Sequence, residues 1–289
     1  MKRLEGKCAL VTGGTQGLGL EAASALAAEG ASVMICARDE ARLGQAVEVI
    51  RAASPGAVVS GCRADVSDRQ DVASLVRHTC AELGGLDILF ANAGIYGPIG
   101  PIDEVDMDEW VTALNINLMG VVFCCRESLP VMKQQRSGKI IITSGGGATK
   151  PMPNFSAYAA SKAGVVRFAE TLALEVQEYG IAVNVVAPGA LNTRLLEQVL
   201  AAGPSKTGKT FYESSIRQRD SGGDSAQQAA ALCAFLASAD SDGISGKLIS
   251  ARWDPWKTMT KHIDELKGSD IYTLRRIVPD DRGKDWGKQ

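Results

Sequence analysis

Short apolar runs alternate with longer stretches of helical periodicity along most of this chain. The apolar runs occupy residues 8–11, 32–36, 58–63, 88–91, 139–143, 182–187 and 247–250, and helical patterns occupy 19–29, 41–52, 69–82, 108–133, 156–179 and 225–237. The connections between successive runs are long enough to hold helices, which is how parallel strands are joined. The alternation therefore predicts an α/β fold with a doubly wound parallel sheet between two helical layers, in a single domain.

The composition narrows the class of protein. The chain has 289 residues, enough to bury a full core, and its formal net charge is −2 with a pI of about 5.8. This balance gives no reason to expect a nucleic acid or an anionic membrane as partner. No apolar run approaches the ~18 residues that span a bilayer, and residues 1–7 are too charged for a secretion signal. We therefore expect a cytoplasmic protein that binds neither nucleic acid nor membrane.

Cysteine and histidine usage argues against a metal centre. The seven cysteines are scattered without a C-x-x-C pair, and His78 and His262 are the only histidines. Scattered cysteines in a reducing cytosol are typical of small buried hydrophobic side chains. We expect no metal site and no histidine-based triad.

Two segments interrupt the alternation. Residues 190–223 form a long glycine-containing connection, typical either of a substrate lid or of a disordered loop. Residues 257–289 form a polar tail that keeps apolar and aromatic side chains, so we expect it to pack on the domain or on a neighbouring subunit. The main domain would then span residues 1–256. Trp253 and Trp256 are expected to pack against the tail or in an oligomer interface, with a pocket wall as the alternative.

A glycine-rich segment lies between the first expected strand and the first helix. Its glycines allow a tight turn and close approach of a pyrophosphate, whose charge the amino end of the helix stabilises. This position is typical of the dinucleotide-binding turn of a Rossmann-type sheet, although a glycine-rich turn without a ligand is the alternative. The residues expected to contact the cofactor here are Thr12, Gly13, Thr15, Gln16, Gly17, Leu18 and Gly19.

The end of the second expected strand bears on the choice of cofactor. An acidic residue there usually binds the ribose 2′-hydroxyl of NAD, whereas an arginine can bind the 2′-phosphate of NADP. This chain has Arg38 at that place, followed directly by Asp39. Arg38 favours NADP(H), and Asp39 leaves NAD(H) open.

Tyr158 and Lys162 lie four residues apart on an expected helix and so share one face. A phenol has an ordinary pKa of about 10 and is a poor acid or base at neutral pH. A neighbouring ammonium stabilises the phenolate and lowers that pKa, which suits general acid–base catalysis. The pair is thus a candidate acid/base, with the pKa of Tyr158 lowered by Lys162, although Tyr and Lys at this spacing also occur by chance on many solvated helices.

Further motifs lie in a fixed order along the chain and complete this pattern. They are Asp65-Val66 after the third expected strand, Asn92-Ala93-Gly94 after the fourth, Asn117 in the next helix, and Pro188-Gly189 with Thr193 after the sixth. With the glycine-rich turn and the Tyr158/Lys162 pair, the set resembles the short-chain dehydrogenase/reductase family over residues 5–250, and in particular its 3-oxoacyl-ACP-reductase-like members.

The resemblance implies hydride transfer between a nicotinamide cofactor and a carbonyl compound or secondary alcohol. It implies that Tyr158 is the acid/base, that Lys162 lowers its pKa and binds the ribose, and that Asn117 helps to order a proton-relay water. Family members are commonly dimers or tetramers built on paired helices, which implies a homodimer or homotetramer. The resemblance places the adenine at Asp65 and Val66, the body of the cofactor at Asn92, Ala93 and Gly94, and the nicotinamide at Pro188, Gly189 and Thr193.

One position departs from the family pattern. Counting back from Tyr158 and forward from Gly138 both place the family's catalytic serine at Gly145, with Ser144 just before it. Losing one such donor typically costs about 10²–10³ in rate. A water, a substrate hydroxyl or the side chain of Ser144, Asn154 or Ser156 could replace it, with Ser144 the doubtful member of the catalytic set. Alternatively, the protein binds cofactor with little turnover, as a regulatory or scaffolding protein of the same fold.

The connection over residues 190–223 carries a slight excess of positive charge. Such an excess suggests an oxygenated or anionic substrate, for instance a sugar derivative or a 3-oxoacyl thioester, although charge runs usually form a solvated face. The basic residues are Arg194, Lys206, Lys209, Arg217 and Arg219, and the acidic ones are Glu197, Glu213 and Asp220.

Overall fold

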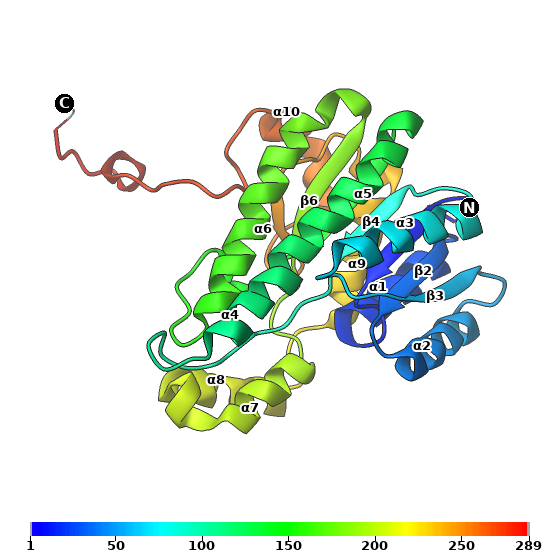
Figure 1. Cartoon of the computed structure of the whole chain (residues 1–289). Coiled ribbons are helices and arrows are strands. Elements are labelled where there is room, and N and C mark those ends of the chain that lie inside the picture. The colour runs from blue at the N-terminus through cyan, green and yellow to red at the C-terminus, as the bar shows by residue number, and fades with distance from the viewer. Residues whose placement is uncertain (1, 288–289) are drawn as a thin grey trace.

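One parallel sheet runs through the part of the chain that the structure, a computed structural model, describes: residues 2–287 (Figure 1). The strand order is β3-β2-β1-β4-β5-β6-β7, and every neighbouring pair is parallel. The order reverses between β1 and β4, which opens a crevice at the carboxyl ends of the strands. The predicted doubly wound sheet is confirmed. Its strands are β1 (Cys8–Thr12), β2 (Ser32–Ala37), β3 (Val59–Arg63), β4 (Ile88–Ala91), β5 (Gly138–Thr143), β6 (Ile181–Ala187) and β7 (Leu248–Ser250).

Helices cover both faces of the sheet, and the strand residues alternate between two cores. Along β1, Ala9 and Val11 pack with one set of helices while Leu10 packs with the other, because successive strand residues point to opposite faces. One layer consists of α1 (Gly17–Ala28), α2 (Glu40–Ala53) and α9 (Ala226–Ala237), and the other of α3 (Arg69–Leu83), α5 (Gly120–Gln135) and α6 (Ser156–Glu175).

The helix expected over residues 108–133 is two helices joined by a wider turn. α4 (Met107–Leu114) and α5 are separated by the π-helical turn η1 (Asn115–Met119). A turn of this kind inserts an extra residue and often marks a functional site. The helix expected over 156–179 ends at Glu175, and the 3-10 turn η3 (Gln177–Tyr179) follows it before Gly180 adopts a left-handed conformation.

Residues 190–223 contain two helices, α7 (Arg194–Thr207) and α8 (Lys209–Asp220). Gly203 has a φ of 75° and breaks α7 before Pro204. In Figure 1 both helices lie below the sheet and outside its two layers. This position next to the crevice suits a lid.

The chain beyond β7 first packs on the domain, and its last described part then extends away from the domain. Trp256, Met259 and Leu266 are buried in the same core as α1 and α9. They belong to the 3-10 turn η5 (Trp256–His262) and the short helix α10 (Ile263–Leu266). Figure 1 shows the last described residues, up to residue 287 and including the turn η6 (Pro279–Arg282), projecting away from the body. Among residues 2–287, no helix is long and apolar enough to cross a membrane.

Candidate active site

The glycine-rich turn is joined to the end of β4 by hydrogen bonds. The Thr12 hydroxyl accepts from the backbone amides of Asn92 (2.9 Å) and Ala93 (3.1 Å). The side-chain amide of Asn92 donates to the backbone carbonyl oxygens of Thr12 (3.1 Å) and Gly13 (3.3 Å). A Cβ on Gly19 would lie 2.7 Å from Asn92 Nδ2, so only glycine permits this close approach. The turn is therefore fixed before any ligand binds.

The side chains of Arg38 and Asp39 at the end of β2 differ in their protein partners. Asp39 is the N-cap of α2 and accepts a hydrogen bond from the Arg42 amide at 3.1 Å. The Arg38 side chain is 62% exposed, and its Nη1 lies 3.8 Å from Asp65 Oδ2. Asp39 is thus occupied by its own helix, whereas Arg38 has only a loose partner.

Asn117 lies in the π-helical turn and is fully buried. Its Oδ1 accepts from the Ile95 amide at 2.8 Å, and its Nδ2 donates to the Ile95 carbonyl at 2.8 Å and to Ser161 Oγ at 3.0 Å. Ser161 in turn donates to the Tyr158 carbonyl at 2.8 Å. Asn117 therefore ties the loop after β4 to the turn of α6 that carries Tyr158.

Tyr158 and Lys162 lie side by side on α6, as their spacing predicts. The Lys162 ammonium lies 5.7 Å from the centre of the Tyr158 ring and donates to the Thr143 carbonyl at 2.8 Å. Burial lowers the pKa of Lys162 to about 8. Burial, with a smaller contribution from Tyr96, raises the pKa of Tyr158 above its ordinary value. The sequence led us to expect a lowered pKa at Tyr158, but burial raises it instead.

Gly145, two residues beyond the end of β5, lies directly against the Tyr158 ring. A Cβ on this glycine would lie 2.8 Å from Tyr158 Cζ and closer still to the phenol oxygen. The Tyr158 ring thus occupies the space that a side chain at 145 would need. By contrast, a Cβ on the neighbouring Gly146 would meet no atom within 4 Å.

The three side chains considered as substitutes for the serine have different surroundings. The Ser144 hydroxyl is buried and has no hydrogen-bond partner in the described chain. Ser156 Oγ accepts from Trp110 Nε1 at 3.0 Å and so is already engaged. Asn154 borders the cleft with a positive φ of 69°. Of the three, Ser144 and Asn154 line the cleft, whereas Ser156 does not.

A single cleft of about 1330 Å³ joins these groups at the carboxyl edge of the sheet. Most residues expected to contact the cofactor line this cleft. Thr12, Gly19 and Asn117 are not among the lining residues. Gly189 borders it through a left-handed turn, and Asp224 holds that turn by accepting from the Ala190 amide at 2.7 Å. The expected residues on the wall are Gly13, Thr15, Gln16, Gly17, Leu18, Arg38, Asp65, Val66, Asn92, Ala93, Gly94, Ser144, Tyr158, Lys162, Pro188, Gly189 and Thr193.

Aromatic side chains that sequence reasoning missed form one wall of this cleft. The Tyr96 ring contacts that of Tyr158 edge-on, with centroids 4.7 Å apart, and that of Phe155 at 5.2 Å. Phe211 of α8 packs on Phe155 at 4.9 Å. Tyr96 follows the Asn92-Ala93-Gly94 motif by two residues, which is the only sequence signal that could have pointed to it.

The two tryptophans after β7 differ. Trp256 is buried against Phe235 and its Nε1 donates to the Ala251 carbonyl at 3.2 Å, so it packs in the core. Trp253 is exposed at the rim of the cleft, where the Arg252 guanidinium stacks on it at 4.3 Å.

In the described part of the chain, no cluster of His, Cys, Asp and Glu could hold a metal ion.

Comparisons with known proteins agree with this geometry. The model of the short chain dehydrogenase family matches residues 7–202. Levodione reductase of Leifsonia aquatica is 33% identical over 251 residues, which is 86% of this chain and 93% of that protein. L-fucose dehydrogenase of Bos taurus is 35% identical over 82% of this chain and 84% of that protein.

Solved structures give the same result. The crystal structure of levodione reductase has a TM-score of 0.80 at 32% identity, and covers 86% of this chain and 96% of its own. That of NAD+-bound xylitol dehydrogenase has a TM-score of 0.80 at 27% identity, over 86% of this chain and 98% of its own. The chain belongs to the short-chain dehydrogenase family and is an oxidoreductase that acts on alcohol or carbonyl substrates with a nicotinamide cofactor.

Proposed function

We propose that this protein is an NADP(H)-preferring carbonyl reductase in which Tyr158 is the proton donor. The observation that carries the proposal is the fixed group of Asn117, Tyr158 and Lys162 on one side of a cleft whose other side is the glycine-rich turn. A protein that only binds cofactor has no use for a buried acid/base pair beside the substrate space.

The cleft suits a dinucleotide in its shape and its backbone. A side chain at Gly94 would lie 3.2 Å from Asn117 Oδ1 and 3.6 Å from Lys162 Nζ, so glycine keeps this part of the cleft open. We propose that the glycine-rich turn holds the pyrophosphate, that Asp65 and Val66 border the adenine, and that Lys162 binds the nicotinamide ribose. When bound, the nicotinamide supplies the site that gives or takes hydride.

The arrangement after β2 supports NADP(H) over NAD(H). An acidic side chain that binds a ribose hydroxyl must be free, and the Asp39 carboxylate instead caps α2 and lies 3.5 Å from Arg42 Nε. Arg38 is exposed with a partner at 3.8 Å, so its guanidinium can turn to a 2′-phosphate. Arg42 also borders the cleft and adds positive charge there.

The protonation of Tyr158 supports reduction as the favoured direction. Because burial raises the pKa of this phenol, it stays protonated at neutral pH and can donate to a carbonyl oxygen. Lys162, with a pKa of about 8, keeps its charge at pH 7 and stabilises the negative charge that remains on the phenol after donation. Oxidation would require the phenolate, which this burial disfavours.

The wall beside Tyr158 supports a substrate with an apolar body. Tyr96, Met152, Val199 and Phe211 line or close this part of the cleft, while Lys209 lies at its border on α8. Such a wall suits a cyclic ketone or the acyl chain of a 3-oxoacyl thioester. We propose that α7 and α8 form the lid over this substrate.

The experiment compares the oxidation of NADPH and NADH with one cyclic ketone, one 3-oxoacyl thioester and one ketose as substrates. We expect a higher kcat/KM with NADPH and with the two apolar-bodied compounds. Tight cofactor binding with no hydride transfer to any of a broad carbonyl panel would instead indicate the regulatory or scaffolding role.

A further inference from the structure

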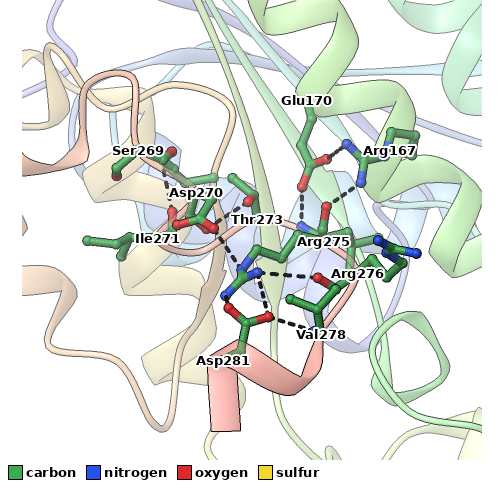
Figure 2. A network of polar contacts seen from close by, with 12 residues as sticks. Arg167, Glu170, Ser269, Asp270, Ile271, Thr273, Arg275, Arg276, Val278 and Asp281 are labelled. Atoms are coloured by element: carbon green, nitrogen blue, oxygen red, sulfur yellow. Dashed lines mark hydrogen bonds and ion pairs between the residues drawn. The ribbon is translucent and has the colours of Figure 1, made fainter. Parts of the chain in front are cut away.

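The C-terminal extension is held on α6 by a nearly buried carboxylate. We call its residues 269–274 the strap. Glu170 Oε1 accepts from the Leu274 amide at 2.6 Å, and Arg167 donates to the carbonyl oxygen of the same residue (Figure 2). Arg167 and Glu170 also form an ion pair at 2.7 Å. Because α6 is the helix that carries Tyr158, this end of the strap is fixed to the helix of the proposed proton donor.

A second set of contacts fixes the strap to the last strand of the sheet. The Leu248 amide of β7 donates to the Tyr272 carbonyl at 2.8 Å. The Lys247 ammonium donates to the carbonyl oxygens of Ser269 and Ile271, both at 3.0 Å. Lys247 is only 5% exposed, so these two oxygens supply the hydrogen bonds that water would otherwise provide. The strap therefore joins α6 to β7.

The backbone of the strap is held in an uncommon conformation. Tyr272 has a φ of 60°, in the left-handed region that a bulky side chain seldom adopts. The amide and the hydroxyl of Thr273 donate to the Asp270 carbonyl at 3.2 and 2.7 Å, and Arg275 forms an ion pair with Asp270 at 2.7 Å (Figure 2). Such a conformation persists only where the surroundings hold it, so the place of the Tyr272 ring is set by the contacts of the strap.

Tyr272 also contacts the chain that follows β7. We call residues 250–254 the wall turn. The Tyr272 ring packs against the core that contains Ala251 and Trp256. Burial, and after it the neighbouring Asp254 carboxylate, raises the pKa of the Tyr272 phenol above its ordinary value. The strap thus meets the wall turn through one side chain, in addition to its bonds with β7.

The wall turn forms part of the cleft. Asp254 Oδ2 accepts from the Ser250 amide at 2.7 Å, and Ser250 Oγ accepts from the Trp253 amide at 3.2 Å. No residue of the strap lines the cleft, so the strap can act on a ligand there only through this wall. The lining residues in this part of the chain are Leu248, Ser250, Arg252, Trp253 and Asp254.

An ion pair joins the wall turn to the part of the cleft where we expect the nicotinamide. Arg252 pairs with Asp224, which accepts from the Ala190 amide at 2.7 Å. Ala190 directly follows Gly189, one of the residues expected at the nicotinamide. The wall turn therefore borders the end of the cleft at which hydride transfer would take place.

We propose that the strap holds the wall turn in the position where it meets the substrate, with Glu170, Lys247 and Tyr272 as positioning residues. This inference rests on the proposed function, because it takes the reacting carbonyl to lie beside Tyr158. A wall that moves by about an ångström can misplace a substrate enough to lower the rate about 10²-fold. The glycine-rich turn is held by Thr12 and not by the strap, so cofactor binding should not depend on these residues.

The experiment measures two effects of releasing the strap in the full chain. Glu170→Ala removes the acceptor of the Leu274 amide, and Lys247→Met removes the donor to two strap carbonyls. In both variants we expect faster amide hydrogen exchange in residues 248–254 and a KM for a cyclic ketone that is raised about 10-fold. Exchange in the glycine-rich turn and the KM for NADPH should stay at their wild-type values.

Three further variants separate positioning from stability. Glu170→Gln keeps an oxygen that can accept from the Leu274 amide, so it should restore the wild-type KM for the ketone. Tyr272→Gly keeps the left-handed backbone but removes the ring beside the wall turn, and should raise that KM. Lys139→Met is the matched control, because this mostly buried lysine pairs with Asp242 at 2.6 Å outside the cleft, and it should keep both KM values. Thermal melting sets an assay temperature at which every variant is folded.

Three results would overturn the inference. The first is wild-type exchange in residues 248–254, or a wild-type KM for the ketone, once the strap is released. The second is a KM for NADPH that rises as much as the KM for the ketone, and the third is the same rise in Lys139→Met. A wild type that reduces no carbonyl compound would instead contradict the proposed function, and the exchange comparison would still decide whether the strap holds the wall turn.

Discussion

The two ends of the cleft differ in how their polar groups are satisfied. At the nucleotide end, Thr12 and Asn92 bond to each other's backbone and to Gly13, so the turn is complete without a ligand. At the substrate end, neither the Tyr158 hydroxyl nor the buried Ser144 hydroxyl has a hydrogen-bond partner among residues 2–287. The protein alone thus holds the turn at the nucleotide end, whereas these two hydroxyls at the substrate end are available to bond with a substrate.

The geometry of the nucleotide end follows from the fold, whereas that of the substrate end depends on the side chains of this particular sequence. The nucleotide end depends on backbone geometry and close approach, which any sequence with the same glycines reproduces. The substrate end depends on which side chain fills each place, and here the Tyr158 ring lies against Gly145. Changes at the substrate end should therefore alter chemistry while cofactor binding remains.

The largest effect is expected from Tyr158→Phe. Removing the proton donor should lower kcat by about 10²–10⁴-fold. The ring stays in place, so cofactor affinity should change little. Steady-state turnover together with cofactor titration measures both. Tyr96→Phe is the matched control, because it removes a hydroxyl from the adjacent ring. Equal turnover in Tyr158→Phe and the wild type would show that the proton comes from another group.

The next largest effect is expected from Gly145→Ala. The added Cβ would collide with the Tyr158 phenol and displace it by about an ångström, a shift that can cost about 10²-fold in rate. Gly146→Ala is the matched control, since its Cβ meets nothing within 4 Å. Comparing kcat of the two variants checks this. Higher activity in Gly145→Ser than in the wild type would mean that a hydroxyl is wanted there and that the ring moves aside.

The sequence predicts the sheet and the position of the glycine-rich turn for a physical reason. Strand alternation and a glycine-rich turn are local patterns, so residues 8–37 already contain the first β-α-β unit and its glycine-rich turn. The substrate end could not be predicted in this way. The contact between Gly145 and Tyr158, and the stacking of Phe211 on Phe155, join residues that only the folded chain brings together.

Two further differences arise from effects that short patterns do not carry. The periodicity of residues 108–133 fits one helix, and nothing in it marks the π-helical turn that places Asn117 toward Ile95. The spacing of Tyr158 and Lys162 predicts a lowered pKa, but the degree of burial decides the sign. Burial depends on the loop after β4 and on the lid, which lie far away in sequence.

The third prediction concerns the nucleotide end. Arg38→Ala should raise KM for NADPH by about 10- to 100-fold, because a charge-assisted bond to the 2′-phosphate is lost. KM for NADH should hardly change. Arg77→Ala, an arginine on α3 outside the cleft, is the control. If NADH is the better cofactor of the wild type and Arg38→Ala leaves its kinetics unaltered, the proposed preference is wrong.

Lys162, which we propose binds the nicotinamide ribose, gives a pH dependence. Its pKa of about 8 is below the ordinary value, so the ammonium loses its charge as pH rises through 8. From pH 7 to 9 the charged fraction falls about tenfold. We expect cofactor affinity to weaken by up to that factor over this range. Titration of the wild type and Lys162→Met should show the pH dependence in the former and a flat profile in the latter.

The same pKa has a defined effect on stability. The unfolded chain holds the Lys162 proton up to about pH 10.4, whereas the folded chain releases it near pH 8. Between these values the unfolded state binds more protons, so this group's contribution to the free energy of unfolding rises with pH. Denaturant unfolding of the wild type relative to Lys162→Met should show that rise, and a fall would contradict the lowered pKa.

The smallest effect is expected at the lid. Phe211→Ala removes the ring that packs on Phe155, and an aromatic pair is worth about 0.5–1.5 kcal/mol beyond its buried area. KM for an apolar-bodied ketone should therefore rise about 2- to 10-fold. Cofactor affinity should stay unchanged, because Phe211 packs on Phe155 at the substrate end of the cleft and not on the glycine-rich turn. Glu213→Ala, an exposed change on the same helix, is the control. A loss of cofactor affinity in Phe211→Ala would mean that the lid supports both ends of the cleft and that they do not act separately.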